Sequence, residues 1–430
     1  MRVLWVTYDI FNSINGLVSG RPSYGRPWVE SLFNNQHDCN DISIAIATPV
    51  TKGKTQKLEF KGTLYYIFPK SKNKSLTKIG NKMRNNYIEI LNDFKPDIIH
   101  IHGSEINLGL LKKYTSNDIP IVISIQGIIP PCSDYLRLSV ANINYKKYRS
   151  LKNILGRGGV NGALRKWSTF IPIEKEIFKI NRYFIGRTSW DKSYVSAYNP
   201  KAQYFNGEEI LRDEFYNSHW EINKCERHSI FISSSAYALK GFHLLLKAAS
   251  ILKAKYPNIK IITPLSSIKS KRSKFIDLLF SEDYNRFIKK EINRLNLTDN
   301  VELKGYLSAK QMANEYKKAH IFVLPSFLEN SPNSLGEAMI VGTPSVTALT
   351  GGVPYLTRNE IDVLSFPIND YTMMAYQIDR IFSNDNLAVK LSENAKQAGY
   401  KRHHIKSTVE EYTNIYKTII KTHREESENE

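Results

Sequence analysis

"PSFLENSPNSLGEAMIVGTPSV", residues Pro325 to Val346, marks the junction between a buried strand and a helix. The apolar run that leads into it, Ile321 to Pro325, has the length and β-branched content of a parallel strand covered on both faces. In the helix that follows, Ser331 is predicted as the N-cap, Pro332 as the first residue and Gly342 as the end. Because the first amides of a helix have no partners within it, this junction predicts an anion-binding site.

Strand-like apolar runs alternate with helical patterns along the chain, which predicts an α/β fold with parallel sheets. A chain of 430 residues exceeds the size at which a single core keeps growing, so we expect two domains. The stretch around 205–226 lacks strand character and precedes a fresh strand, so we divide the chain into an N-terminal domain, 1–215, and a C-terminal domain, 216–406. A terminal helix is predicted at about 407–424, with a capping box formed by Ser407 and Glu410.

Three cysteines, Cys39, Cys132 and Cys225, lie far apart and form no C-x-x-C pair. This spacing argues against a disulfide framework and a zinc site, and for a reducing compartment. The apolar run in the N-terminal stretch "MRVLWVTYDIF" is too short for a signal peptide or a membrane span. We interpret this stretch as the first buried strand. We therefore expect a cytoplasmic protein.

A formal net charge of +19 is the most unusual feature of the composition. The segment from Lys70 to Arg84 holds six cations and no acid, and no acidic residue occurs between Asp134 and Glu174. Basic residues interleaved with Tyr, Leu, Ile and Trp, as in Tyr145 to Trp167, suit an anionic membrane surface or an anionic polymer. A solvated basic face is the alternative, and nucleic acid is disfavoured because no nucleic-acid-binding motif accompanies the charge. We expect peripheral association with the inner face of the membrane.

Ligands of parallel sheets bind beyond the carboxyl ends of the strands, so the residues that end the strands are the candidate site residues. Several of these ends are polar or glycine-rich: His102-Gly103, Gln126-Gly127, Lys240-Gly241 and Gly351-Gly352. Lys240 and the start of the helix near Pro332 would give a positively polarised site suited to a diphosphate. Glu337, in the second turn of that helix, could accept hydrogen bonds from vicinal hydroxyls such as those of a ribose.

The quoted stretch, followed by "GGVP", resembles the signature of glycosyltransferase family 4, the retaining nucleotide-sugar enzymes of GT-B fold, whose Glu-x7-Glu pair matches Glu329 and Glu337. The similarity extends to "KPDIIHIHG", "LKGFHLLLKAASIL" and "VELKGYLSAKQMANEY". The resemblance implies two Rossmann-like domains that face each other across a cleft, with the C-terminal helix crossing back onto the N-terminal domain. It also implies transfer of a sugar from a nucleotide sugar to a polysaccharide or lipid-linked saccharide.

The resemblance assigns roles to individual residues. Glu337 is expected to bind the ribose, Glu329 to contact the transferred sugar, and Lys240 to hold the diphosphate beneath a loop that contains Gly25. Gln126 and His102 join Glu329 as candidate catalytic residues. Arg187 is a candidate for meeting an acceptor anion because it follows the end of a predicted strand, not because of the resemblance. The remaining candidates for donor binding are Tyr306, Asn333, Ser334, Leu335, Gly351 and Gly352.

Two departures from the family are visible. The stretch "SSSAYALKG" lacks the arginine that family members commonly carry before the Lys-Gly pair, and Gln126 replaces a histidine at the end of its strand. No D-x-D triplet is present, so we expect neither a metal nor another cofactor. His100 and His102 could share a strand face, but no third ligand is evident, and His100 is expected to be a core residue.

Other interpretations remain open. A nucleotide-sugar epimerase of the same architecture would use the same donor, and a basic protein that binds membranes or nucleic acid could use two Rossmann domains. The chain lacks the glycine-rich loops of dinucleotide and ATP sites. Glu329 and Glu337 could also be surface carboxylates, and Lys240 an ordinary residue at a helix start.

Overall fold

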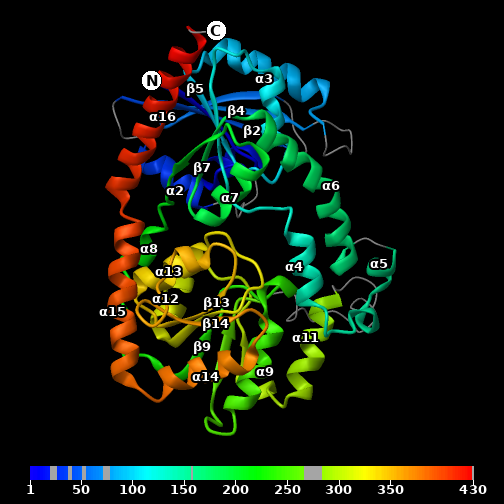
Figure 1. Cartoon of the computed structure of the whole chain (residues 1–430), viewed down its shortest axis with the longest axis vertical. Coiled ribbons are helices and arrows are strands. Elements are labelled where there is room, and N and C mark those ends of the chain that lie inside the picture. The colour runs from blue at the N-terminus through cyan, green and yellow to red at the C-terminus, as the bar shows by residue number, and fades with distance from the viewer. Residues whose placement is uncertain are drawn as a thin grey trace. The chain divides into compact units, whose positions relative to one another are not determined.

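The computed structural model describes residues 1–19, 27–36, 41–50, 55–70, 78–155, 158–265 and 283–428. The chain forms two compact units, which are described separately (Figure 1). The first unit consists of Met1–Pro130, Thr169–Ile210 and His403–Glu430, and the second of Pro131–Ser168 and Leu211–Arg402.

The first unit is built on an eight-stranded sheet with the order β3-β4-β2-β1-β5-β6-β7-β8. All neighbours are parallel except the edge pair β3 and β4, which is antiparallel. The apolar runs of β1 and β5 form its centre because helices cover both faces of a parallel sheet. The strands are β1 (Arg2–Val6), β2 (Ser43–Val50), β3 (Gln56–Phe60), β4 (Thr63–Pro69), β5 (Ile98–His102), β6 (Ile121–Ser124), β7 (Tyr183–Gly186) and β8 (Gln203–Asn206).

Helices from both ends of the sequence pack on this sheet. Tyr412, Tyr416 and Ile419 of the C-terminal helix, red in Figure 1, are buried in the same core as Val3 and Trp5 of β1. The helices of the first unit are α1 (Asn12–Ser19), α2 (Pro27–Gln36), α3 (Asn81–Phe94), η1 (Asn107–Tyr114), α7 (Ser189–Tyr198) and α16 (Ile405–Ser427). Helix α6 (Gly159–Ile180) begins in the second unit and ends in the first.

The second unit contains a six-stranded parallel sheet with the order β11-β10-β9-β12-β13-β14. This is the strand order of doubly wound nucleotide-binding folds, in which the strand order reverses between β9 and β12. Every residue of β12 is buried, as the apolar run predicts. The strands are β9 (Glu226–Phe231), β10 (Lys260–Thr263), β11 (Val301–Leu303), β12 (Ala319–Leu324), β13 (Ser345–Leu349) and β14 (Leu364–Pro367).

Helices surround the sheet of the second unit, and their apolar faces form one continuous core with it. Helix α13 packs on α15, and α14 packs on α9. The helices are α4 (Cys132–Ser139), η2 (Tyr145–Tyr148), α5 (Leu151–Ile154), α8 (Asp213–Tyr216), η3 (Ala238–Lys240), α9 (Phe242–Leu252), α11 (Asp283–Arg294), η4 (Thr298–Asn300), α12 (Ala309–Lys318), α13 (Asn333–Val341), η5 (Val353–Tyr355), α14 (Tyr371–Phe382) and α15 (Asp385–Arg402).

Two boundaries differ from those expected from sequence. The segment Pro131–Ser168 belongs to the second unit, whereas we expected it within an N-terminal domain spanning 1–215. The predicted capping box of Ser407 and Glu410 is wrong, because α16 begins at Ile405 and its N-cap is His404. The His404 ring accepts a hydrogen bond from the amide of Ser407, which lies inside the first turn.

Within the described residues, no helix combines the length and the apolar character needed to cross a lipid bilayer.

Candidate active site

The reversal of strand order between β9 and β12 in the second unit places two loops next to each other. Strands β9 and β12 pair in parallel, with Ile230 opposite Ile321, and their crossovers lead to opposite sides of the sheet. Beyond such a point the loops diverge and leave a ligand-binding crevice. The loop after β9 carries Lys240, and the loop after β12 carries Glu329.

Lys240 and Glu329 form a mostly buried ion pair, with Nζ 2.5 Å from Oε1. Burial alone would lower the pKa of Lys240, but the carboxylate of Glu329 outweighs that effect and holds this pKa above its usual value. Lys240 is therefore a permanent cation beside a carboxylate. The two residues predicted to hold a diphosphate and a sugar are in direct contact.

Close backbone packing fixes the loop that carries Glu329. Gly241 and Gly351 adopt left-handed conformations, with φ values of 67° and 49°, and a Cβ at either position would lie 1.9–2.0 Å from a backbone oxygen of this loop. The amide of Gly352 donates to the carbonyl of Glu329 at 3.0 Å, and the amide of Phe327 donates to the carbonyl of Leu239 at 2.7 Å. Gly241 thus allows close approach to the backbone of Pro325, and Gly351 to that of Glu329, in the same loop.

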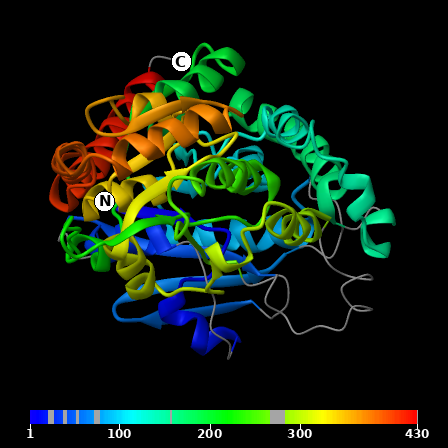
Figure 2. The same cartoon turned by 90° about the horizontal axis from the view of Figure 1, so that it is seen from below.

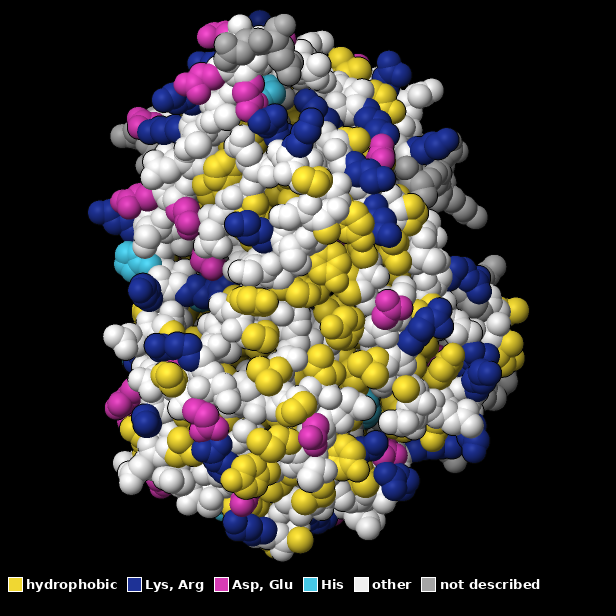
Figure 3. All heavy atoms as spheres, in the orientation of Figure 1, with side chains coloured by type: hydrophobic (Ala, Val, Ile, Leu, Met, Phe, Trp, Pro, Cys, Tyr) yellow, Lys and Arg dark blue, Asp and Glu magenta, His cyan; other side chains and the backbone are white. Residues whose placement is uncertain are grey.

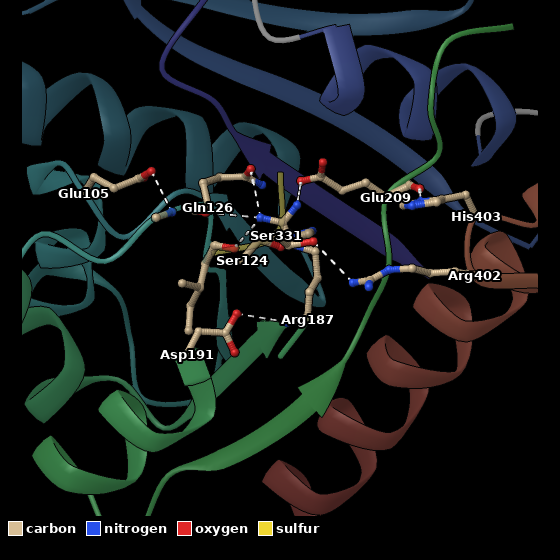
Figure 4. A network of polar contacts seen from close by, with 12 residues as sticks. Glu105, Ser124, Gln126, Arg187, Asp191, Glu209, Ser331, Arg402 and His403 are labelled. Atoms are coloured by element: carbon tan, nitrogen blue, oxygen red, sulfur yellow. Dashed lines mark hydrogen bonds and ion pairs between the residues drawn. The ribbon is translucent and has the colours of Figure 1, made fainter. Parts of the chain in front are cut away.

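Helix α13 starts one residue later than predicted. Pro332 is its N-cap, with an extended backbone (φ −72°, ψ 114°), and it offers no side-chain cap, so the assignment of Ser331 as N-cap is wrong. The hydroxyl of Ser331 instead accepts a hydrogen bond from Arg402 at 3.3 Å (Figure 4). Asn333, Ser334 and Leu335 form the first turn, in which the amide of Leu335 donates to the carbonyl of Pro332 at 3.0 Å. The amides that precede it in such a turn favour an anion.

Glu337 lies in the second turn of α13 and is almost fully buried. Its Oε1 accepts a hydrogen bond from Arg212 at 2.7 Å, and its Oε2 accepts one from the hydroxyl of Tyr316 at 3.3 Å. Burial raises the pKa of Glu337 and the nearby Glu214 adds to the rise, whereas Arg212 and Tyr316 oppose it. Sequence reasoning missed Arg212 because 125 residues separate it from its partner.

In the first unit, Gln126 lies at the end of β6 within a polar network (Figure 4). Arg187 donates from Nη2 to the backbone carbonyls of Ile125 and Gln126, both at 3.2 Å, and to the Gln126 side-chain oxygen at 3.4 Å. Its Nη1 lies 2.6 Å from Oε1 of Glu209, and both side chains are buried. Arg187, our candidate for an acceptor anion, therefore already has an internal counterion, and its contacts orient Gln126.

Two carboxylates hold the loop that follows Gln126. Glu105 accepts from the amide of Gly127 at 3.0 Å. Glu174 accepts from the amide of Ile129 and from the hydroxyl of Ser104, both at 2.7 Å. Burial raises the pKa of Glu174 to about 8, and the charge of Glu105 contributes. No sequence pattern pointed to Glu174, because it lies within the C-terminal half of α6 and not at the end of a strand.

The remaining candidates have different surroundings. His100 is a core residue, as expected: its ring nitrogens bond to the hydroxyls of Tyr416 at 2.7 Å and Ser124 at 2.6 Å, and burial lowers its pKa to about 3. His102 is also buried, with its ring centroid 4.4 Å from that of Trp5. Tyr306 is exposed after β11. Gly25 lies outside the described residues.

A metal site is not evident in the part of the chain that the structure describes. There, no group of three or more His, Cys, Asp or Glu side chains is arranged to hold a metal ion. The positive charge in the second unit's site comes from Lys240, Arg212 and Arg402, together with the start of α13.

The second half of this chain is similar to known glycosyltransferase sequences. Residues 215–398 match the family model described as "Glycosyl transferases group 1". An uncharacterized glycosyltransferase of Methanocaldococcus jannaschii is 24% identical over 161 residues, which cover 37% of this chain and 41% of that protein. The 2-deoxystreptamine N-acetyl-D-glucosaminyltransferase of Niallia circulans is 30% identical over 105 residues, 24% of this chain and 27% of the relative. The chain thus matches less than half the length of these curated relatives.

Solved structures match nearly the whole chain. Sucrose-phosphate synthase from Thermosynechococcus elongatus has a TM-score of 0.72 at 15% identity, covering 98% of this chain and 100% of that one. The Anabaena protein HepE in complex with UDP-glucose has a TM-score of 0.65 at 13% identity, covering 98% of this chain and 99% of that one. The likeness confirms the predicted fold class, an α/β protein with two parallel-sheet, Rossmann-like units of the GT-B type.

The ion pair of Arg212 and Glu337 predicts a pH-dependent loss of stability on substitution. Arg212→Met leaves a buried carboxylate without its cation, which should lower the free energy of unfolding by about 2 kcal/mol at pH 8. The loss should shrink towards about pH 5, because removal of Arg212 raises the folded-state pKa of Glu337 further and a protonated carboxyl needs no cation. Urea unfolding at both pH values measures this difference.

Arg227→Met is the matched control, since Arg227 pairs with Asp385 on the exposed surface of the same unit. It should cost less than about 1 kcal/mol at either pH. Equal losses for Arg212→Met at the two pH values would contradict the assignment of Arg212 as the group that keeps Glu337 ionised.

Proposed function

We propose that this protein is a retaining glycosyltransferase, similar to family 4, that transfers a sugar from a nucleotide sugar to a polysaccharide or lipid-linked saccharide. The observation that carries the proposal is the buried pair of Lys240 and Glu329 where the strand order of the second unit reverses, next to the start of α13. The match of residues 215–398 to group 1 glycosyl transferases covers all of these residues and supports the proposal.

The donor is held through its ribose and its diphosphate. Glu337 accepts hydrogen bonds from the ribose hydroxyls, and Arg212 keeps its carboxylate ionised and oriented for this task. The amides of Asn333 and Ser334 at the start of α13 and the cation of Lys240 bind the diphosphate. The solved HepE structure contains UDP-glucose, which makes a uridine nucleotide the first donor to test.

In the proposed reaction, the bond between the anomeric carbon and the diphosphate oxygen breaks while a bond to the acceptor hydroxyl oxygen forms on the same face. Negative charge grows on the departing diphosphate, where Lys240 and the amides of α13 stabilise it. The acceptor proton passes to that diphosphate. Glu329 accepts from hydroxyls of the transferred sugar, and its contact with Lys240 couples sugar and phosphate binding.

Substitution of Glu337 tests the donor site. Glu337→Ala should weaken binding of UDP, or of GDP or ADP if one of these is the preferred nucleotide, by about ten-fold to a hundred-fold, since a hydrogen bond to a charged group contributes about 1.5–3 kcal/mol. Isothermal titration calorimetry measures the affinity. Glu360→Ala, which removes a surface carboxylate paired with Arg380, should leave it unchanged. Unchanged affinity in Glu337→Ala would exclude this residue from the nucleotide site.

Substitution of Gln126 tests the assignment in the first unit. A glutamine amide can orient a sugar hydroxyl but exchanges no proton near neutral pH, so Gln126 acts by positioning. Gln126→Ala should lower turnover by about ten-fold to a hundred-fold, or about 1.4–2.7 kcal/mol, with little change in nucleotide affinity. Gln126→His restores the family's residue and should keep more activity than Gln126→Ala. Full activity in Gln126→Ala would show that Gln126 only packs at the end of its strand and does not contribute to turnover.

Metal independence is a third expectation. Lys240 and the start of α13 supply positive charge where other glycosyltransferases use a D-x-D-bound cation, and the chain has no D-x-D triplet. Release of nucleotide from the donor in the presence of acceptor should therefore continue in excess chelator. Loss of turnover that manganese restores would contradict this account of the phosphate site. Isomerised sugar without net nucleotide release would favour an epimerase.

A further inference from the structure

Exposed aliphatic side chains gather around α5. Leu151, Ile154 and Leu155 are 52%, 63% and 71% exposed and lie within five residues of one another, and Leu138 at the end of α4 is also exposed. Helix α5 lies at the outer edge of the second unit in both ribbon views (Figure 1 and Figure 2). We call the exposed side chains of residues 138–155 the α5 surface.

Positive charge accompanies these aliphatic side chains. From residue 135 to residue 173 the sequence has eight Lys or Arg and no Asp or Glu. Lys146 and Lys147 of η2 are exposed, and Lys152 is half-exposed between Leu151 and Ile154. Figure 3 shows hydrophobic and basic side chains side by side at the right-hand edge, over the position of α5 in Figure 1.

Residues 145–160 are anchored to α11 on their inner side. The exposed aliphatic side chains of α5 are therefore held in place by the fold. The ring of Tyr148 packs on Phe287 of α11 with centroids 5.4 Å apart. Arg286 donates to the carbonyl of Arg149 at 2.9 Å, and the amide of Val160 donates to Asp283 at 3.1 Å. A capping box between Ser150 and Asn153 fixes the start of α5 itself.

We infer that the α5 surface docks this protein reversibly on an anionic lipid bilayer. Aliphatic side chains flanked by lysines combine two weak signals, insertion below the headgroups and attraction to acidic lipids, which together suffice for peripheral binding. A second copy of the chain would bring the same positive charge and be repelled. A stable protein interface takes about 20–30 residues from each side, more than this surface offers. The inference does not depend on the proposed function.

The other basic segment of the sequence, Lys70 to Arg84, does not carry this inference. Residues 71–77 lie outside the described part of the chain.

Co-sedimentation of the full chain with vesicles tests the inference. Binding should be strong on phosphatidylcholine vesicles with about 30% phosphatidylserine, at least ten-fold weaker on phosphatidylcholine alone, and weak again in about 0.5 M salt. The variant Leu151→Ser/Ile154→Ser/Leu155→Ser keeps every charge and should lose at least ten-fold in binding to the anionic vesicles. Lys146→Gln/Lys147→Gln keeps the aliphatic side chains and should reduce both binding and its salt dependence.

Ile251→Ser/Ile361→Ser is the matched control, because both isoleucines are exposed elsewhere in the second unit. It should bind vesicles like the unaltered protein, and all variants should unfold at the same temperature. Equal binding to neutral and anionic vesicles, or full binding by the triple serine variant, would overturn the inference. Two other outcomes would also overturn the inference. One is self-association that the triple serine variant abolishes, and the other is RNA binding, without vesicle binding, that the same variant abolishes.

Discussion

The parallel pairing of β9 with β12 is the constraint on which the second unit depends. Ile230 lies opposite Ile321 and Phe231 opposite Phe322, so segments that are about ninety residues apart in sequence end at the same edge of one sheet. The loops beyond them must part, because their crossovers lead to opposite sides. Lys240 and Glu329 meet where the loops part. Gly241 and Gly351 are needed there because any side chain would strike the backbone that carries Glu329.

Three buried carboxylates of the candidate site each pair with a cation, and such a buried ion pair is costly in isolation. The attraction between two buried charges offsets the free energy of removing them from water only when their geometry is good and further hydrogen bonds are made. Replacing such pairs by apolar residues therefore often stabilises a protein. Here Lys240 matches Glu329, Arg212 matches Glu337, and in the first unit Arg187 matches Glu209. The pairs are therefore better explained by the ligand they prepare for than by stability alone.

Local sequence patterns predicted the strands and the residues that follow them, because these features depend on interactions between neighbours in the sequence. The apolar runs gave the strands, and polar residues after strands identified Lys240 and Glu329, because parallel strands end at a common edge. Contacts between distant side chains left no such pattern: Arg212 with Glu337 and Arg187 with Gln126 span 125 and 61 residues. The N-cap assigned to Ser331 failed for the same reason, since its hydroxyl bonds to Arg402, 71 residues away.

The place of α16 in the first unit has a consequence for synthesis on the ribosome. The core that contains Val3 and Trp5 is closed by Tyr412, Tyr416 and Ile419, and buried His100 reaches a hydrogen-bond partner in Tyr416. Every residue of the second unit precedes these side chains in the sequence. Domains usually fold in the order in which they are synthesised, N-terminal first. Here the core of the second unit can be completed before the core of the first unit. The half made first must wait, with part of its apolar surface uncovered, until translation is almost over.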